Sequence, residues 1–175
     1  RPFAKNFPGA SAGEIHERRT LARWLCMRVT LHVMPSDEVP FFHQAYPFDY
    51  LERPTPPQFR GGGLLAGAGL CEESGAEALL DDLHQRVLGF LAENGPSTVR
   101  QMGSKVPELR AKIRHDVGKP YEGEFSIGSR LVGGMCARGL LVRAKPRGTW
   151  RSNLYEYALP SDWLPGVDLE SVTQD

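Results

Sequence analysis

The 175-residue chain has only three cysteines, no net charge and no long apolar run. Cys26, Cys71 and Cys136 are odd in number and far apart, which is typical of reduced thiols rather than of a disulfide framework or a metal pair. No apolar run approaches the roughly 20 residues that a helix needs to span a bilayer. The N-terminus also lacks the basic-then-apolar order of a signal peptide. These absences predict a globular, cytoplasmic protein without a membrane partner.

Positive charge is local rather than global, because 21 Lys and Arg residues balance 21 Asp and Glu residues. A protein that binds nucleic acid through its net charge is therefore excluded. Residues 81–160 nevertheless hold 13 cationic and 8 acidic side chains, and residues 139–153 hold four cations and no acid. Any basic surface is expected in this second half of the chain.

Composition divides the chain into four segments. Residues 53–73 are dense in Pro and Gly and predict a connection. Before it, Leu21, Trp24 and Leu25 have helical spacing and the following residues alternate up to Pro35, which predicts a helix followed by a strand. The predicted organisation is a remnant of a first domain over 1–52, the connection over 53–73, a second domain over 74–160 and a tail over 161–175, so the chain resembles a fragment of a longer protein.

Two helices are predicted at the start of the second domain. Ser74 and Glu77 form a capping-box pattern, an apolar stripe follows, and Asn94-Gly95-Pro96 supplies a stop. Thr98 and Gln101 form a second capping box for a short helix that Pro107 closes. Two helices joined by a tight Gly-Pro turn indicate the beginning of a helix-turn-helix.

A third helix is predicted over residues 126–138, with Ser129, Arg130, Ala137 and Arg138 outward. Each of its three internal glycines costs roughly 0.5–1 kcal/mol relative to alanine. Tight packing against a neighbouring helix offsets that cost more often than close approach to a nucleic-acid backbone, so packing is the favoured interpretation.

Two short alternating runs, 141–145 and 154–159, enclose a turn at Arg147-Gly148 and predict a hairpin. Three helices followed by such a hairpin make a winged helix. The predicted fold is therefore α+β, mainly helical: a winged helix-turn-helix of three helices and a β-hairpin wing, preceded by a remnant of another winged-helix domain. In that architecture the third helix enters the major groove and the wing contacts the flanking backbone.

The wing residues suit contact with phosphates. Arg147 and Arg151 carry forked donors, and Gly148 lets the turn approach closely. Trp150 is more often packed under a hairpin than stacked on a base. Solvated, solubilising cations are the alternative, but the absence of any acid favours phosphate contact.

Two blocks resemble a known family, the bacterial winged-helix DNA-binding proteins that include glycosylases for interstrand crosslinks and bulky alkylated bases. "RRTLARWLCMRVTLHVMP" (18–35) is similar to the end of that family's first winged helix. "GKPYEGEFSIGSRLVGGMCARGLLVRAKPRGTWRSNLYEYAL" (118–159) is similar to its second winged helix with an Arg-Gly-x-Trp wing. The resemblance implies several winged helices around a basic channel.

The resemblance implies DNA contact but carries over no catalytic residue. Catalytic members use a Gln-hydrophobic-Gln or Gln-hydrophobic-Asp motif to position a water, and no glutamine of this chain has Gln or Asp two residues later. Whether the chain is an enzyme is therefore open; if it is, the resemblance implies a DNA glycosylase. The predicted DNA-contacting residues are Arg28, His32, Ser129, Arg130, Arg143, Lys145, Arg147, Gly148, Trp150 and Arg151.

The sequence thus predicts a module that binds double-stranded DNA in a DNA-repair protein. A winged-helix transcriptional regulator and a protein-interaction module are the alternatives, since fold alone does not decide the partner. No cofactor or metal is predicted, because the five histidines lack metal-ligand spacing. His115, Asp116, Glu122 and Glu124 are expected to lie in a solvated loop between the second and third helices.

Overall fold

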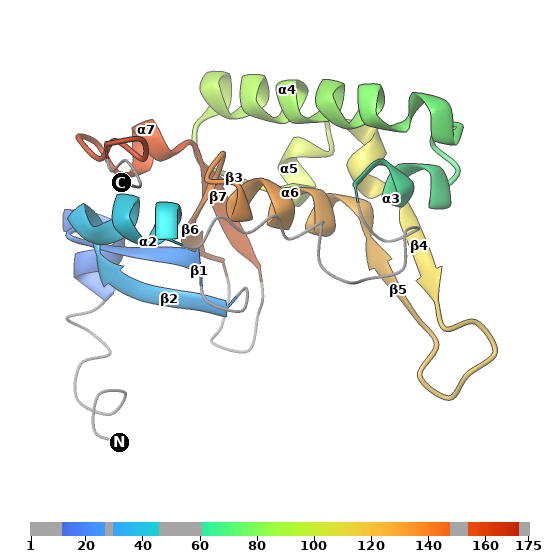
Figure 1. The fold of residues 1–175 in the computed structure, drawn as a ribbon, viewed down its shortest axis with the longest axis horizontal. Helices are drawn as coiled ribbons and strands as arrows, with labels where there is room; N and C mark the ends of the chain where they lie inside the picture. The colour runs from blue at the N-terminus through green and yellow to red at the C-terminus, as the bar shows by residue number, and fades with distance from the viewer. Residues whose placement is uncertain (1–11, 27–29, 46–60, 148–153, 172–175) are drawn as a thin grey trace.

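A computed structural model describes residues 12–26, 30–45, 61–147 and 154–171 (Figure 1). The protein is a mixture of helices and small antiparallel sheets. Its first part contains the π-helical turn η2 (Glu14–Arg18), β1 (Leu21–Cys26), β2 (Thr30–Pro35), the 3-10 turn η3 (Ser36–Glu38), α2 (Val39–Ala45) and α3 (Gly61–Gly67). The 3-10 turn η6 (Glu73–Gly75) leads from α3 into the second part.

The second part alternates helices and short strands. In chain order these are α4 (Ala76–Asn94), β3 (Ser97–Thr98), α5 (Val99–Met102), the 3-10 turn η7 (Pro107–Arg110), β4 (Lys112–His115), β5 (Gly123–Ser126), α6 (Ile127–Ala137), β6 (Val142–Pro146), β7 (Tyr155–Ala158) and α7 (Pro160–Trp163). β7 pairs with both β6 and β3, so a three-stranded sheet in the order β3-β7-β6 follows α6. The predicted hairpin over 141–159 is confirmed by the pairing of β6 with β7.

The segment around Trp24 is a strand, and the predicted helix over this stretch is wrong. β1 pairs antiparallel with β2 in a regular register from Leu21 opposite Pro35 to Cys26 opposite Thr30. Ala22, Trp24 and Cys26 are buried on one side while the residues between them are half-exposed. Because Leu21 and Leu25 are also half-exposed, their four-residue spacing reflects one face of a two-sided strand rather than a helical stripe.

Helix α4 begins without the predicted capping box. Its N-cap is Gly75, which makes no side-chain cap, and the carboxylate of Glu77 instead accepts a hydrogen bond from the Gly62 amide at 2.9 Å. Glu77 therefore ties α4 to α3, a helix within the predicted connection over 53–73. Leu64 and Leu65 of α3 are fully buried in the main core.

The other predicted helix signals are present. α4 ends at Asn94, and the amide of Gly95, which has a φ of +70°, donates to the Leu91 carbonyl. The capping box of Thr98 and Gln101 starts α5 as predicted. α5 ends at Met102, however, and Pro107 begins the turn η7 instead of closing a helix.

Helix α6 occupies the centre of the protein and lies beneath α4 (Figure 1). β1 lies beside α6, as do β6 and β7, the two strands that follow α6 in the chain. Of its residues, Ser129 is exposed and Arg130 half-buried, whereas Ala137, predicted to face outward, is buried. The burial raises the pKa of the Cys136 thiol to about 12. A helix that is apolar on nearly all sides is typically buried in the core, and apart from Ser129 and Arg130 this is true of α6.

Two apolar clusters make up the core of the described residues. The larger lies between α3, α4, α5 and α6. The smaller joins side chains of β1 with those of β6, β7 and α7, including Trp24, Val142, Ala144 and Trp163. The segments on either side of the Pro/Gly-rich stretch therefore share one buried cluster.

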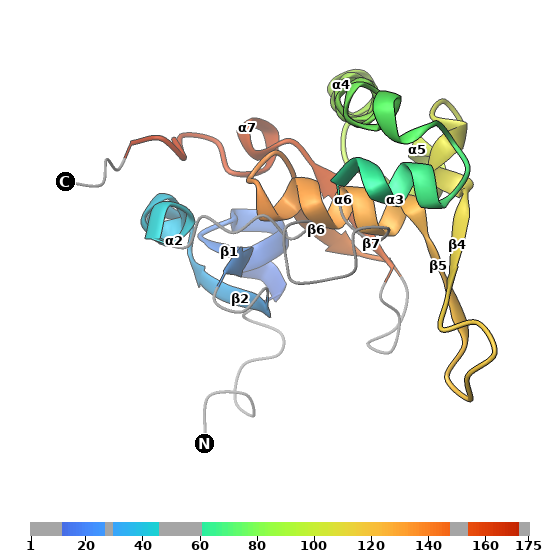
Figure 2. The same cartoon turned by 45° about the vertical axis from the view of Figure 1, so that its right-hand side comes forward.

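The stretch between α5 and α6, predicted as a solvated loop, contains the hairpin β4–β5. β4 pairs with β5 from Lys112 opposite Ser126 to His115 opposite Gly123. The hairpin extends away from the helices in both views (Figures 1 and 2). The sequence prediction missed it because charged residues alternate with few apolar ones here, so the period-2 signal is weak.

Gly128 provides a test of the tight packing of α6. A Cβ at this position would lie 2.6 Å from Val99 Cγ1 and 2.7 Å from the Leu109 carbonyl oxygen, while a Cβ at the exposed Gly89 of α4 would meet nothing within 4 Å. We expect Gly128→Ala to lower the free energy of unfolding by about 1–3 kcal/mol through overpacking. Gly89→Ala, the matched control, is expected to raise it by about 0.5–1 kcal/mol. Urea denaturation of both variants measures the difference, and stabilisation by Gly128→Ala would contradict the packing.

Candidate nucleic-acid interface

The predicted wing cations that the structure describes follow β6 toward the turn of the β6–β7 hairpin. Arg143 is half-buried in the middle of β6, Lys145 is exposed near its end, and Arg147 is exposed just after it. The predicted wing residues Gly148, Trp150 and Arg151, and Arg28 in the other hairpin, lie outside the described residues.

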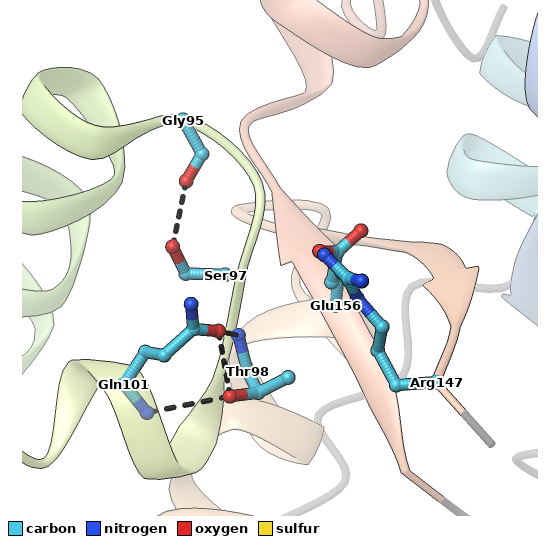
Figure 3. Close-up of polar contacts among 6 residues, drawn as sticks. All are labelled: Gly95, Ser97, Thr98, Gln101, Arg147 and Glu156. Carbon is cyan, nitrogen blue, oxygen red and sulfur yellow. Dashed lines mark hydrogen bonds and ion pairs between the residues drawn. The ribbon is translucent and has the colours of Figure 1, made fainter.

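Arg147 is held by an acid that follows in β7. Its Nε donates to Oε1 of Glu156 at 2.8 Å, and its Nη2 donates to the same oxygen (Figure 3). The Arg147 side chain is 61% exposed, whereas that of Glu156 is only 7% exposed. Arg147 therefore neutralises a buried carboxylate in the half of the hairpin nearer the turn, which competes with the phosphate contact predicted for it.

Glu156 lies where the three-stranded sheet meets α5. Its Cα partner across the sheet is Thr98, the N-cap of α5. The Thr98 amide and hydroxyl both donate to Gln101 Oε1, at 2.9 and 2.8 Å (Figure 3). The pairing of Glu156 with Thr98 thus connects β7 to the start of α5. The Glu156 carboxylate is bonded to Arg147, and the Thr98 amide and hydroxyl are bonded to Gln101.

A second group of cations gathers around Tyr155, the first residue of β7. The guanidinium of Arg23, from β1, lies 5.8 Å from the centre of the Tyr155 ring, and that of Arg143, from β6, lies 5.5 Å from it. Both distances are within the range of a cation–π interaction. Arg23 Nη1 and Arg143 Nε are buried and have no hydrogen-bond partner among the described residues. Sequence reasoning did not identify Arg23, because it lies more than a hundred residues from the wing.

His16 and Lys145 extend this group of cations. Burial lowers the pKa of His16 from its ordinary value, and the positive charges of Arg23 and Lys145 lower it further, while Glu17 acts in the opposite direction. His16 Nδ1 is also buried without a hydrogen-bond partner in the part of the chain that the structure describes. Because η2 and β6 both contact β1, these three elements bring the charges close together.

The remaining predicted contacts lie at two other places. His32 is half-buried in β2, with its Nε2 2.6 Å from the Thr30 hydroxyl. Ser129 and Arg130 lie in the first turn of α6, where the Arg130 guanidinium is 4.4 Å from the centre of the Phe125 ring. The structure therefore brings Arg143 and Lys145 together with Arg23 and His16, and it places Arg130 on the β4–β5 hairpin.

The β4–β5 hairpin is nearly neutral and has an apolar tip. Ion pairs join Lys112 to Glu124, Arg114 to Glu122 and Lys119 to Asp116. Two large side chains near the tip, Val117 and Tyr121, are 65% and 64% exposed. This surface differs in chemistry from the group of cations around Tyr155.

Other kinds of site have little support in the described residues. No group of three or more metal-ligating side chains occurs among them, and no helix there is long and apolar enough to cross a membrane. A cavity of about 680 Å³ lies beside α3 and is lined mainly by Gly, Ala and two exposed glutamates. Cys26, Cys71 and Cys136 are free, as predicted for reduced thiols.

Comparison with known proteins defines a class of DNA-repair protein. A family model described as "DNA glycosylase AlkZ-like" matches residues 4–175. The chain therefore belongs to the AlkZ-like DNA glycosylase family, and this confirms the glycosylase and repair side of the resemblance. Comparisons with curated proteins and with solved structures gave no match.

The Arg147–Glu156 pair can be tested by its effect on stability. Arg147→Ala leaves a buried carboxylate without its cation, so we expect the free energy of unfolding to fall by about 1–2 kcal/mol, less than for a fully buried pair because water screens the exposed guanidinium. Lys145→Ala, an exposed cation two residues earlier, is expected to change it by no more than about 0.5 kcal/mol. Adding Glu156→Gln to Arg147→Ala should recover part of the loss in a double-mutant cycle, and additive effects would show that the pair is not coupled.

Proposed function

We propose that this chain is the double-stranded-DNA contact module of an AlkZ-like repair protein, built on a winged helix-turn-helix. The observation that carries the proposal is that Arg23 and Arg143 meet over Tyr155, with Lys145 and His16 near Arg23, and that no carboxylate among the described residues forms an ion pair with any of the four. Family membership supports DNA as the ligand.

The order of elements supports the winged-helix part of the proposal. A long helix, a short strand, two further helices and a hairpin follow one another as α4, β3, α5, α6 and β6–β7. The short strand pairs with the second strand of the hairpin, which gives the three-stranded sheet of that architecture. The β4–β5 hairpin is an additional element between the last two helices.

The burial of α6 limits how this module meets DNA. A recognition helix reads base edges with side chains along its exposed face. Because only Ser129 and Arg130 are accessible on α6, it can offer DNA no more than its first turn. The DNA contact we propose is therefore made mainly by β1, β6 and the hairpin ends, and it is directed at the backbone.

The two alternative functions, a transcriptional regulator and a protein-interaction module, require other surface features. A transcriptional regulator requires sequence readout, for which the buried α6 is poorly suited. A protein-interaction module requires an apolar patch, and of the large exposed apolar residues that are described only Val117 and Tyr121 share an element, while Val33, Phe41 and Leu154 lie elsewhere. Backbone contact by cations accounts best for the charge distribution.

The proposal predicts a specific loss of phosphate contacts. Arg143→Gln and Lys145→Gln are each expected to weaken duplex binding to a similar degree for all sequences and to flatten the slope of log affinity against log salt by roughly 0.9. Lys105→Gln, an exposed cation beside α4, is the matched control and should leave the slope unchanged. Titrating a labelled duplex at several salt concentrations measures this. An unchanged slope in the Arg143 and Lys145 variants would remove the basis of the proposal.

The apolar tip of the β4–β5 hairpin predicts a second kind of contact. Apolar side chains on projecting elements wedge between base steps in the minor groove without neutralising phosphates. We expect Tyr121→Ala to reduce duplex affinity several-fold while keeping the salt slope of the wild-type protein. Tyr121→Phe is the control and should bind as the wild type does. Equal affinity of Tyr121→Ala and wild type would exclude the tip from the interface.

A further inference from the structure

The most unusual polar feature of the described residues is a set of buried side-chain nitrogens that have no hydrogen-bond partner. Arg23 Nη1, Arg143 Nε and His16 Nδ1 are each shielded from solvent and have no hydrogen-bond partner. A buried donor left without an acceptor costs about 1–3 kcal/mol, and more when the donor is charged. Three such atoms in one region indicate a function that offsets this cost.

The geometry brings these groups together from three separate elements. Arg23 belongs to β1 and Arg143 to β6, and both guanidinium groups lie over the ring of Tyr155. β1 contacts both η2, which carries His16, and β6, which carries Lys145. The charges of Arg23 and Lys145 act on His16 across these contacts. The aromatic ring holds two cations that repel each other, so it keeps the site assembled without an acid.

The nearby acids do not neutralise this group. Glu156, the neighbour of Tyr155, is bonded to Arg147. Glu14 of η2 is bonded to Arg18 and to the Thr20 hydroxyl. Glu17 is exposed and acts on His16 through space, with a smaller effect than Arg23 or Lys145. The region therefore keeps an excess of positive charge.

We propose that His16, Arg23, Arg143 and Lys145 form a subsite for a single phosphate group, and that binding of the phosphate is coupled to protonation of His16. Guanidinium groups supply forked donors that match the oxygens of a phosphate, and Lys145 supplies an exposed point charge. That this phosphate belongs to the backbone of a bound DNA strand rests on the proposed function.

The direction of the coupling follows from the charges around His16. In the free protein burial, and after it the charges of Arg23 and Lys145, favour the neutral imidazole and lower the pKa of His16 below its ordinary value of 6.5. A bound anion favours the imidazolium and raises the pKa again, so binding takes up a proton. The affinity for the anion therefore increases as the pH falls below the pKa of His16 in the bound state, with a slope of log affinity against pH that approaches −1. The increase levels off below the pKa of His16 in the free protein.

The first experiment tests the subsite without DNA. The whole chain, with labelled histidines, is titrated by NMR in chloride, in sulfate and in dimethyl phosphate at constant ionic strength. Sulfate stands in for a free phosphate dianion and dimethyl phosphate for the DNA backbone. We expect dimethyl phosphate to raise the pKa of His16, and Lys145→Gln, which changes only an exposed side chain, to reduce the rise. If sulfate alone raises it, the subsite exists and the ligand is a free phosphate; if neither does, the subsite is overturned.

The second experiment separates the subsite from the proposed function. Duplex affinity is measured between pH 5.5 and 7.5 for wild type, His16→Gln and Lys105→Gln. Wild type and Lys105→Gln should bind about tenfold more tightly per unit fall in pH near the lower end, and His16→Gln should lose most of this gain. Binding with the same pH dependence in His16→Gln overturns the subsite and leaves the DNA contact intact. Absence of duplex binding, together with a rise of the His16 pKa in sulfate, overturns the DNA contact and supports the subsite.

Discussion

The burial of α6, which leaves only Ser129 and Arg130 accessible, is the constraint on which the other features depend. Ile127, Leu131, Val132 and Met135 are fully buried in the main core, and Gly128 lets Val99 and the Leu109 carbonyl approach the helix closely. α6 is thus enclosed by α4 and α5 on one side and by β1 and the neighbouring strands on the other. A helix in this position orients the strands that follow it, and it leaves the hairpins to form the outer surface.

The β4–β5 and β6–β7 hairpins differ in whether their charged side chains are paired. On β4–β5 every pair of opposite charges across the strands is joined, and the exposed apolar residues lie at the end. Around Tyr155 two of the cations lie over an aromatic ring, while Glu156 is bonded to Arg147. The paired charges of β4–β5 leave that hairpin nearly neutral, whereas cations that are not paired with acids keep their capacity to bind an anion.

Membership of the family and the individual residues of the chain give different information about function. The match over residues 4–175 shows membership of the AlkZ-like DNA glycosylases. The glutamine motif that the resemblance associates with catalysis does not occur in this sequence. What the described residues bring together is a group of basic side chains, for which we propose contact with an anionic backbone. Their chemistry depends on charge and hydrogen bonding rather than on a reactive side chain.

Local signals in the sequence determined several elements of this protein. The capping box of Thr98 and Gln101, the stop at Gly95, the apolar spacing over 126–138 and the alternating runs of the last hairpin depend on neighbouring residues, so they could be predicted. Only the tertiary structure decided that residues 21–26 pair with β2 as a strand, since a half-exposed strand and a helix can share a four-residue apolar spacing. It also decided that Arg147 meets Glu156 and that Arg23 meets Arg143 over Tyr155. Contacts between residues far apart in the chain depend on how the elements pack, and packing energy is shared among many side chains that no local pattern records.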